Sequence, residues 1–214
     1  MKVMLYSNGI GPLERKGNIK KTKKILDKVD LITLRDERSY KTLHEIGIEN
    51  KNVKVTADPA LDLDIADEKL GKAILKNEGV PSDKKLLGVS VRKWQNLGSD
   101  FETQIANACD YAYEKYGYYT VFLPMQSSRD TAIMQNIKRK MKHESAIIKK
   151  RYSVEGMLSI IKCFDMCIGM RLHTLIYAAI NSVPLIGLVY DPKINSFMEY
   201  TCLLYTSDAA DEGL

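Results

Sequence analysis

Hydrophobic and polar positions along the chain follow two alternating patterns, one typical of buried strands and one typical of amphipathic helices. Short apolar runs recur, and helical stretches with charged faces separate them. In the first part of the chain we expect strands at Lys2–Tyr6, Asp30–Leu34 and Val53–Thr56, with helices at Asn18–Lys28 and Glu37–Ile46. Strands that alternate with helices in this way predict an α/β fold with a parallel sheet and crossover connections.

A second and more complete α/β set follows a connector at residues 64–85, which holds one helix and a Gly-Val-Pro-Ser turn. The strands expected beyond it are Leu86–Val91, Tyr119–Leu123, Ala146–Ile148, Asp165–Ile168 and Pro184–Val189, and the helices are Phe101–Tyr116, Ser128–Met141, Val154–Cys163 and Arg171–Ile180. Residues 190–193 are expected to form a loop after the last strand. The sequence therefore predicts a partial unit at 1–63 and a fuller unit at 86–201.

Both ends of the chain are expected to depart from a natural protein. Residues 202–214, CLLYTSDAADEGL, show no periodicity, and the first eleven look like a translated transposon-based sequencing adapter. We therefore expect a non-native tail, with natural sequence that continues beyond Thr201. The first unit offers only about three strands, fewer than open parallel sheets usually have, so the N-terminus is expected to be truncated as well.

Composition and charge favour a soluble cytosolic protein. The formal net charge is +5, with 45% hydrophobic and 28% charged residues. No stretch of 18 apolar residues predicts a membrane span, and the first residues lack the features of a signal peptide. The lysine-rich segments Lys16–Lys28 and Lys138–Lys150 are interpreted as solvated helix faces. An acidic-lipid or nucleic-acid surface is less favoured because aromatic residues do not interleave with these lysines.

Polar and cationic side chains recur after the predicted strands, where ligands bind in open α/β sheets. The residues expected to line a cleft there are Asn8, Gly9, Asp58, Arg92, Trp94, Gln126 and Asp191. After the second strand stand Arg35 and Arg38, of which one is expected to face the cleft while the other pairs with Asp36 or Glu37. The sequence does not decide between the two arginines.

The strongest local signal lies in residues 165–180, DMCIGMRLHTLIYAAI, where a strand meets a helix through one glycine. Free backbone N–H groups and the positive dipole end make such a helix start an anion site. Arg171 can add a bidentate grip on phosphate or carboxylate, and His173 can exchange a proton near neutral pH. An isolated arginine or histidine at such a position more often has a structural role. Because Lys193 follows the next strand and adds a further cation, a functional site is the better interpretation.

Other motifs are absent or incomplete. The segment SNGIG does not complete the G-x-G-x-x-G fingerprint, and the sequence has no G-x-x-x-x-G-K-[ST] loop and no H-E-x-x-H. Asp58 and Asp62 could bind a metal, but nothing else supports it. Cys163 and Cys167 have no partner pair at zinc-ligand spacing, so buried free thiols are expected.

Four parts of the chain together resemble the polysaccharide pyruvyl transferase family, most closely its CsaB-type bacterial members. They are SNGIGP at 7–12, DLITLRDERS at 30–39 with VTADPALDL at 55–63, VRKW at 91–94 with FLPMQ at 122–126, and IGMRLHTLIYAA with VPLIGLVYDPK within 168–193. The resemblance implies two Rossmann-like parallel-sheet units in a glycosyltransferase-B-like fold, the N-terminal one incomplete here, with a cleft between them.

The resemblance also implies a reaction. Phosphoenolpyruvate would donate pyruvate to a saccharide as a cyclic ketal in cell-wall or exopolysaccharide biosynthesis, with no metal or cofactor. The saccharide is often carried on a lipid, which would place the protein at the cytoplasmic membrane face. Carried over by motif, Arg35 and Lys193 would bind the donor with Arg171, and His173 would be the general acid or base. The chain by itself is expected to be inactive because its N-terminal half is short.

Two other functions stay open. A nucleotide-sugar glycosyltransferase or epimerase of the same architecture should carry an acidic residue for the ribose hydroxyls, and none stands out after Leu172–Ala179. A non-catalytic protein could use the lysine-rich helices on an anionic surface. The placement of cations at strand ends argues against that function, because a simple surface binder does not need it.

Overall fold

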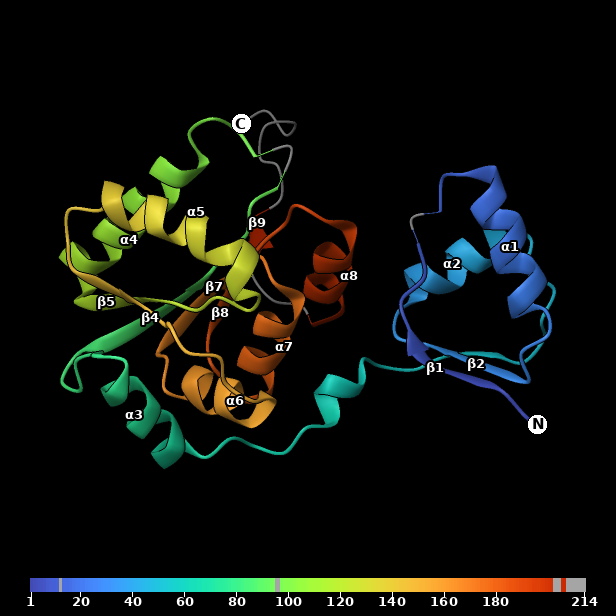
Figure 1. The fold of residues 1–214 in the computed structure, drawn as a ribbon, viewed down its shortest axis with the longest axis horizontal. Helices are drawn as coiled ribbons and strands as arrows, with labels where there is room; N and C mark the ends of the chain where they lie inside the picture. Colours follow the sequence, from blue (N-terminus) through green and yellow to red (C-terminus); the bar gives the residue numbers. More distant parts are fainter. Residues whose placement is uncertain (12, 95–96, 202–204, 207–214) are drawn as a thin grey trace. The chain divides into compact units, whose positions relative to one another are not determined.

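The computed structural model of the protein describes residues 1–11, 13–94, 97–201 and 205–206. It divides into two compact units, Met1–Leu63 and Asp64–Leu214. Each unit has its own parallel sheet with helices packed on it, which confirms the predicted α/β class (Figure 1).

The first unit is a three-stranded parallel sheet in the order β1-β2-β3. The strands are β1 (Met4–Asn8), β2 (Leu31–Leu34) and β3 (Val53–Val55), the helices are α1 (Lys16–Leu26) and α2 (Glu37–Glu45), and a 3₁₀ turn, η1 (Pro59–Asp62), follows β3. Both helices cover one face of the sheet (Figure 1). A small core of buried side chains lies between these helices and the sheet: Leu26, Val29, Ile32, Leu34 and Leu43.

Strand β1 lies two residues later than the sequence predicts, at Met4–Asn8 instead of Lys2–Tyr6. Its pairing with β2 runs from Met4, opposite Leu31, to Asn8, opposite Leu34. The backbone N–H of Ser7 donates to the Thr33 hydroxyl at 2.7 Å, and the Ser7 hydroxyl lies 3.0 Å from that of Thr56. Strand β1 therefore ends at Asn8, at the carboxyl end of the sheet, and Gly9 follows it directly.

The second unit holds a parallel sheet in the order β6-β5-β4-β7-β8-β9. The strands are β4 (Lys85–Ser90), β5 (Tyr118–Phe122), β6 (Ser145–Ile147), β7 (Met166–Gly169), β8 (Leu185–Leu188) and β9 (Tyr205–Thr206). The helices are α3 (Glu68–Asn77), α4 (Phe101–Tyr116), α5 (Ser127–Lys140), α6 (Val154–Lys162), α7 (Leu172–Ile180) and α8 (Pro192–Thr201).

The strand order reverses between β4 and β7. The chain runs from β4 outward through β5 and β6, then crosses back to place β7 and β8 on the other side of β4. Ser90 at the end of β4 pairs with Gly169 at the end of β7. In open α/β sheets a crevice for ligands forms outside the carboxyl ends of the strands at such a switch point.

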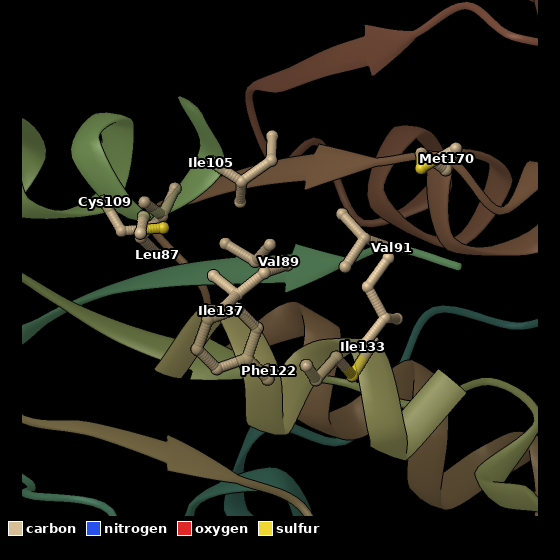
Figure 2. Close-up of a cluster of buried hydrophobic side chains, with 11 residues drawn as sticks. Leu87, Val89, Val91, Ile105, Cys109, Phe122, Ile133, Ile137 and Met170 are labelled. Atoms are coloured by element: carbon tan, nitrogen blue, oxygen red, sulfur yellow. The ribbon is translucent and has the colours of Figure 1, made fainter. Parts of the chain in front are cut away.

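Helices cover both faces of this sheet, so β4 is buried on both sides. Figure 2 shows side chains of β4, α4, α5 and the β7–α7 turn in one apolar cluster. Its buried members are Leu87, Val89, Val91, Ile105, Ala106, Cys109, Phe122, Ile133, Met134, Ile137 and Met170. On the other face, Gly88 leaves room for the ring of Phe164, beyond the end of α6. The central strand is thereby held rigidly under the switch point.

Residues 64–85, predicted to be a connector, contain helix α3, which packs against α6 as part of the second unit. The two helices approach closely at Gly71, because a Cβ atom there would clash with the carbonyl oxygen of Ser159. At the end of α3, the Glu78 carboxylate accepts hydrogen bonds from the backbone N–H groups of Lys149 and Lys150 and from the Tyr152 hydroxyl. These contacts anchor the loop between β6 and α6.

Helix α8 was not predicted, since residues 190–193 were expected to be a loop. The Asp191 carboxylate accepts the Lys193 N–H at 3.0 Å, and Pro192 occupies the first helical position, which suits proline because it lacks an N–H group. Of the predicted non-native tail, Tyr205–Thr206 pairs with β8 as β9, and residues 202–204 and 207–214 lie outside the described residues. The non-native origin of this tail stays a prediction.

The described cysteines are free thiols of low reactivity. Burial raises the pKa of Cys109 and of Cys163 to about 11 and that of Cys167 to about 12. Because the thiolate is the reactive form, these residues are structural. No helix in the described part of the chain has the length and apolar character needed to cross a bilayer.

Replacing Gly71 by alanine should destabilise the second unit strongly. The added methyl group meets backbone of α6, which cannot rotate away, and overpacking of this kind costs about 1–3 kcal/mol or more. Urea unfolding of the Gly71→Ala variant checks this. Gly98→Ala is the matched control, because a Cβ at Gly98 meets no atom within 4 Å. Equal stability of the two variants would contradict the close approach of α3 and α6.

Glu78 should stabilise the protein in a pH-dependent way. Burial acts to raise its pKa, but the hydrogen bonds from Lys149, Tyr152 and Lys150 outweigh burial and lower it. The stabilisation is therefore complete above the unfolded pKa, about 4.3, and is lost as the pH falls through the lower folded value. We expect Glu78→Gln to cost about 1–3 kcal/mol at pH 7 and less toward pH 3. Urea unfolding across this pH range measures the loss of stability, with exposed Glu144→Gln as the control. A loss for Glu78→Gln that does not vary with pH would contradict this role of Glu78.

Candidate active site

The start of helix α7 presents backbone N–H groups at the switch point. Arg171 occupies the N-cap position, with φ −90° and ψ 122°, and its side chain makes no capping hydrogen bond. The helix proper begins at Leu172, one residue later than predicted. The N–H groups of its first turn are donors without a partner inside the helix, and they add to the positive dipole end. This geometry suits an anion.

His173 is the second residue of α7 and lies in its first turn, as the sequence predicted. Its side chain is exposed, and its ring centre lies 6.1 Å from that of Tyr177 at a tilt of 49°. The flanking Leu172 and Thr174 are buried and fix the turn. An exposed imidazole beside open backbone donors can exchange a proton with an anion bound there.

A buried ion pair holds this turn in place. Asp130, at the start of α5, is fully buried, and its carboxylate binds the Nη2 and Nε of Arg171, the latter at 3.2 Å. The same carboxylate accepts the Gln126 N–H at 2.9 Å. Asp130 and Arg171 are 41 residues apart, and no local pattern predicts that they meet. Asp130 thus occupies one edge of the guanidinium, and only the other edge could contact a ligand. The binding of a ligand by Arg171 stays a prediction.

The same turn is also tied to the end of β4. The N–H of Met170 donates to the Ser90 carbonyl at 2.8 Å, and the Thr174 hydroxyl donates to that of Ser90 at 3.0 Å. Both hydroxyls are buried. The two strands at the switch point and the start of α7 therefore form one rigid arrangement.

Lys193 lies in the first turn of α8 and not at the end of a loop. Its Nζ is 3.5 Å from the Asp191 carboxylate, which also caps the helix. The Lys193 side chain is 38% exposed, so it can exchange this partner for an anionic ligand. Lys193 and the start of α8 both contribute positive charge at the carboxyl end of β8.

Two of the predicted cleft residues, Arg92 and Trp94, line a cavity of about 550 Å³ with Lys93, Arg129 and Asp130. Another predicted cleft residue, Gln126, is exposed at the N-cap position of α5, the helix that carries Arg129 and Asp130. Arg129 and Lys93 were not among the residues expected to line the cleft. Lys93 lies between Arg92 and Trp94 in the loop after β4, which is the signal that could have identified it, whereas Arg129 lies in the first turn of α5.

The remaining predicted residues meet in the first unit. The Arg35 guanidinium lies 3.3 Å from the Asp58 carboxylate and 3.5 Å from that of Asp36. It also packs over Gly9, where a Cβ would come within 2.6 Å of it, and the Arg35 N–H donates to the Asn8 carbonyl. Arg35 therefore lies at the carboxyl ends of the three strands and pairs with Asp36, whereas Arg38 is exposed.

Within the described ranges, no group of three or more His, Cys, Asp or Glu side chains could hold a metal ion. Asp58, considered as a ligand from sequence, instead accepts the Ala60 N–H at 3.1 Å and pairs with Arg35.

Replacing Asp130 by asparagine should destabilise the second unit and loosen the start of α7. Breaking a buried pair leaves the Arg171 charge partly buried without its carboxylate, at a cost of about 3–5 kcal/mol. Thermal unfolding of Asp130→Asn against the exposed control Asp83→Asn measures the loss. If both variants unfold at the temperature of the unaltered protein, the pair does not hold the turn.

The chain is similar in fold to solved structures that it matches at low sequence identity. These include a Methanocaldococcus jannaschii UDP-GlcNAc 2-epimerase in complex with UDP-GlcNAc and UDP (TM-score 0.62, 16% identity, 84% of this chain and 51% of that one). They also include the Anabaena protein HepE in complex with UDP-glucose (TM-score 0.61, 12% identity, 91% of this chain and 54% of that one). A third is Staphylococcus aureus MnaA with UDP (TM-score 0.57, 15% identity, 76% of this chain and 44% of that one).

The chain thus spans about half the length of these structures, and identities this low show the fold alone: a two-unit, glycosyltransferase-B-like architecture. No curated protein matches the chain by sequence. The family model of polysaccharide pyruvyl transferases matches residues 1–192, which include β1, the turn before α7 and the first residue of α8. The chain belongs to the polysaccharide pyruvyl transferase family.

Proposed function

We propose that the protein acts in the transfer of pyruvate from phosphoenolpyruvate to a saccharide, as a cyclic ketal, with the donor bound at the start of α7. The observation that carries the proposal is the uncapped start of this helix, which has an exposed His173 in its first turn and a rigid base. The family supports a transferase with a saccharide acceptor.

The charge of the site suits this donor. Phosphoenolpyruvate carries about three negative charges near neutral pH, on a phosphate and a carboxylate. The first-turn N–H groups of α7 can donate hydrogen bonds to one of these groups, and Lys193 at the start of α8 can neutralise the other. Arg35 stays a prediction as a further donor-binding cation; it lies in the first unit, among Gly9, Asp36 and Asp58.

The reaction needs a group that moves protons, and His173 is suited to it. One sugar hydroxyl adds to the central carbon of phosphoenolpyruvate while the methylene carbon takes up a proton. The second hydroxyl then displaces phosphate, which leaves with the second proton. Two C–O bonds form and one breaks, and both sugar protons end on products. A positioned histidine that delivers the first proton contributes about 10²–10⁴-fold.

A nucleotide sugar is the alternative donor, because the epimerase and HepE structures hold UDP or a UDP-sugar. The acceptor sugar is proposed to be a cell-wall or exopolysaccharide unit, carried on a lipid at the cytoplasmic membrane face. Since the chain spans about half of the structures it matches, we propose that it binds its donor without robust turnover.

Calorimetric titration with phosphoenolpyruvate tests the donor assignment. We expect the chain to bind it and the His173→Ala/Lys193→Ala variant to lose at least about tenfold in affinity, because charge-assisted contacts disappear. Lys76→Ala, an exposed lysine on α3, is the control for charge and should bind normally.

The other outcomes of this titration are decisive as well. A chain that is folded by circular dichroism yet does not bind phosphoenolpyruvate contradicts the donor site in the second unit. Binding of UDP under the same conditions, without binding of phosphoenolpyruvate, would favour the nucleotide-sugar alternative.

A further inference from the structure

Aromatic side chains gather at the amino ends of the strands in the second unit, at the opposite end of the sheet from the proposed donor site. Helix α4 ends at Tyr116, and strand β5 begins at Tyr118. Residues 111–118, YAYEKYGY, hold four tyrosines, of which Tyr111 and Tyr116 are each 52% exposed. Large aromatic side chains that are exposed together on one part of a surface mark an interaction site.

Three of these rings form a connected row with a lysine over it. The ring centre of Tyr116 lies 6.0 Å from that of Tyr111 and 6.4 Å from that of Tyr118, and both contacts are edge to face. The Lys115 Nζ lies 5.1 Å from the Tyr111 ring centre and 5.3 Å from that of Tyr116, and it donates to the Tyr111 hydroxyl at 2.6 Å. Tyr111, Lys115, Tyr116 and Tyr118 thus form a tyrosine platform.

The last turns of α4, which carry the platform, are fixed from below. The buried Asp110 carboxylate accepts the backbone N–H groups of Lys142 at 2.9 Å and His143 at 3.1 Å. The His143 ring stacks on that of Tyr113, with ring centres 4.1 Å apart, and its Nε2 lies 3.0 Å from the Glu114 carboxylate. Because α4 is joined in this way to the loop before β6, a ligand on the platform would have little backbone to order.

The charge beside the platform is positive. In the described part of the chain, the side chains of Lys115 and Lys142 have no carboxylate within ion-pair distance. The carboxylate of Glu114, which neighbours Lys115, pairs instead with His143. An anionic group that reached the platform would therefore meet a lysine that no protein carboxylate neutralises.

We propose that the tyrosine platform is a saccharide-binding surface separate from the active site, which holds a stretch of polysaccharide that bears pyruvate ketals. This inference rests on the proposed function, because each ketal formed in that reaction adds a carboxylate to the saccharide. The C–H face of a sugar ring is apolar and can lie on an aromatic ring, while tyrosine hydroxyls bind its polar groups. Lys115 would pair with the ketal carboxylate.

The place of the platform favours a polymer over a lipid surface, although tyrosines also occur where proteins meet a bilayer. A bilayer on the platform would lie beyond the amino ends of the strands, whereas the proposed donor site lies at their carboxyl ends. Strand β5 has five residues and so spans roughly 17 Å, a distance that a chain of several sugars can cover.

The area of the platform also favours a saccharide over a second copy of the chain. Tyr111 and Tyr116 are half exposed, and Tyr118 is less so. A tyrosine buries about 150–250 Å² at most, so these rings alone offer less than the roughly 800 Å² that each partner buries in a standard protein interface.

Calorimetric titration of the full chain with xanthan, a polysaccharide whose side chains carry pyruvate ketals, tests the platform. We expect tighter binding of xanthan than of the same polymer after mild acid has removed its ketals. Tyr111→Ser and Tyr116→Ser should each lose about threefold to tenfold in affinity, and Lys115→Gln should bind both polymers equally. Tyr200→Ser, at an exposed tyrosine outside the platform, is the control and should bind normally. Circular dichroism shows whether each variant is folded.

The proposal is overturned if the folded chain binds neither polymer, if it binds both equally, or if the platform variants bind xanthan as the unaltered chain does. Two measurements test the other occupants. A dimer in sedimentation equilibrium that Tyr116→Ser dissociates would make the platform an interface between copies. Flotation with vesicles of phosphatidylcholine and phosphatidylglycerol that Tyr116→Ser abolishes would make it a lipid-binding surface, and either result overturns the proposal.

Binding of phosphoenolpyruvate separates this proposal from the proposed function. The platform variants should bind phosphoenolpyruvate normally, because they lie at the opposite ends of the strands from His173 and Lys193. If the unaltered chain binds xanthan and not phosphoenolpyruvate, the proposed donor site is wrong and the platform stands. If it binds phosphoenolpyruvate and not xanthan, the platform is wrong and the donor site stands.

Discussion

The buried pair between Asp130 and Arg171 is the interaction on which the arrangement of the second unit's site depends. A fully buried carboxylate is tolerated only where it is paired and hydrogen-bonded, and Asp130 meets that condition through Arg171 and the Gln126 N–H. The pair joins the start of α5 to the start of α7, although these helices follow strands on opposite sides of β4. It also fixes Arg171 as the N-cap, which leaves the first turn of α7 open.

The position of this pair follows from the strand order. Because β7 returns to pair with β4, the ends of both strands lie side by side, and Ser90 can hold both Met170 and Thr174. The switch point therefore carries two positive regions that share Asp130: the start of α7 and the cavity lined by Arg92 and Arg129.

The sequence predicted the α/β class, most strands and the first-turn position of His173, because apolar runs and helix signals are local. It could not show that Asp130 meets Arg171 or that β4 lies next to β7, since these contacts join distant segments. Helix α8 escaped prediction because YDPK was read as a loop, although Asp191 and Pro192 can cap and start a helix. Arg129 escaped because an arginine in the first turn of a helix looks like an ordinary surface residue.

A crystal structure of the chain with bound phosphoenolpyruvate would show whether the donor occupies the start of α7. We expect an anionic group of the ligand within hydrogen-bond distance of the first-turn N–H groups of α7, close to His173, while Arg171 keeps its bonds to Asp130. A ligand bound elsewhere, with the start of α7 empty, would contradict it, and so would a ligand that draws Arg171 away from Asp130.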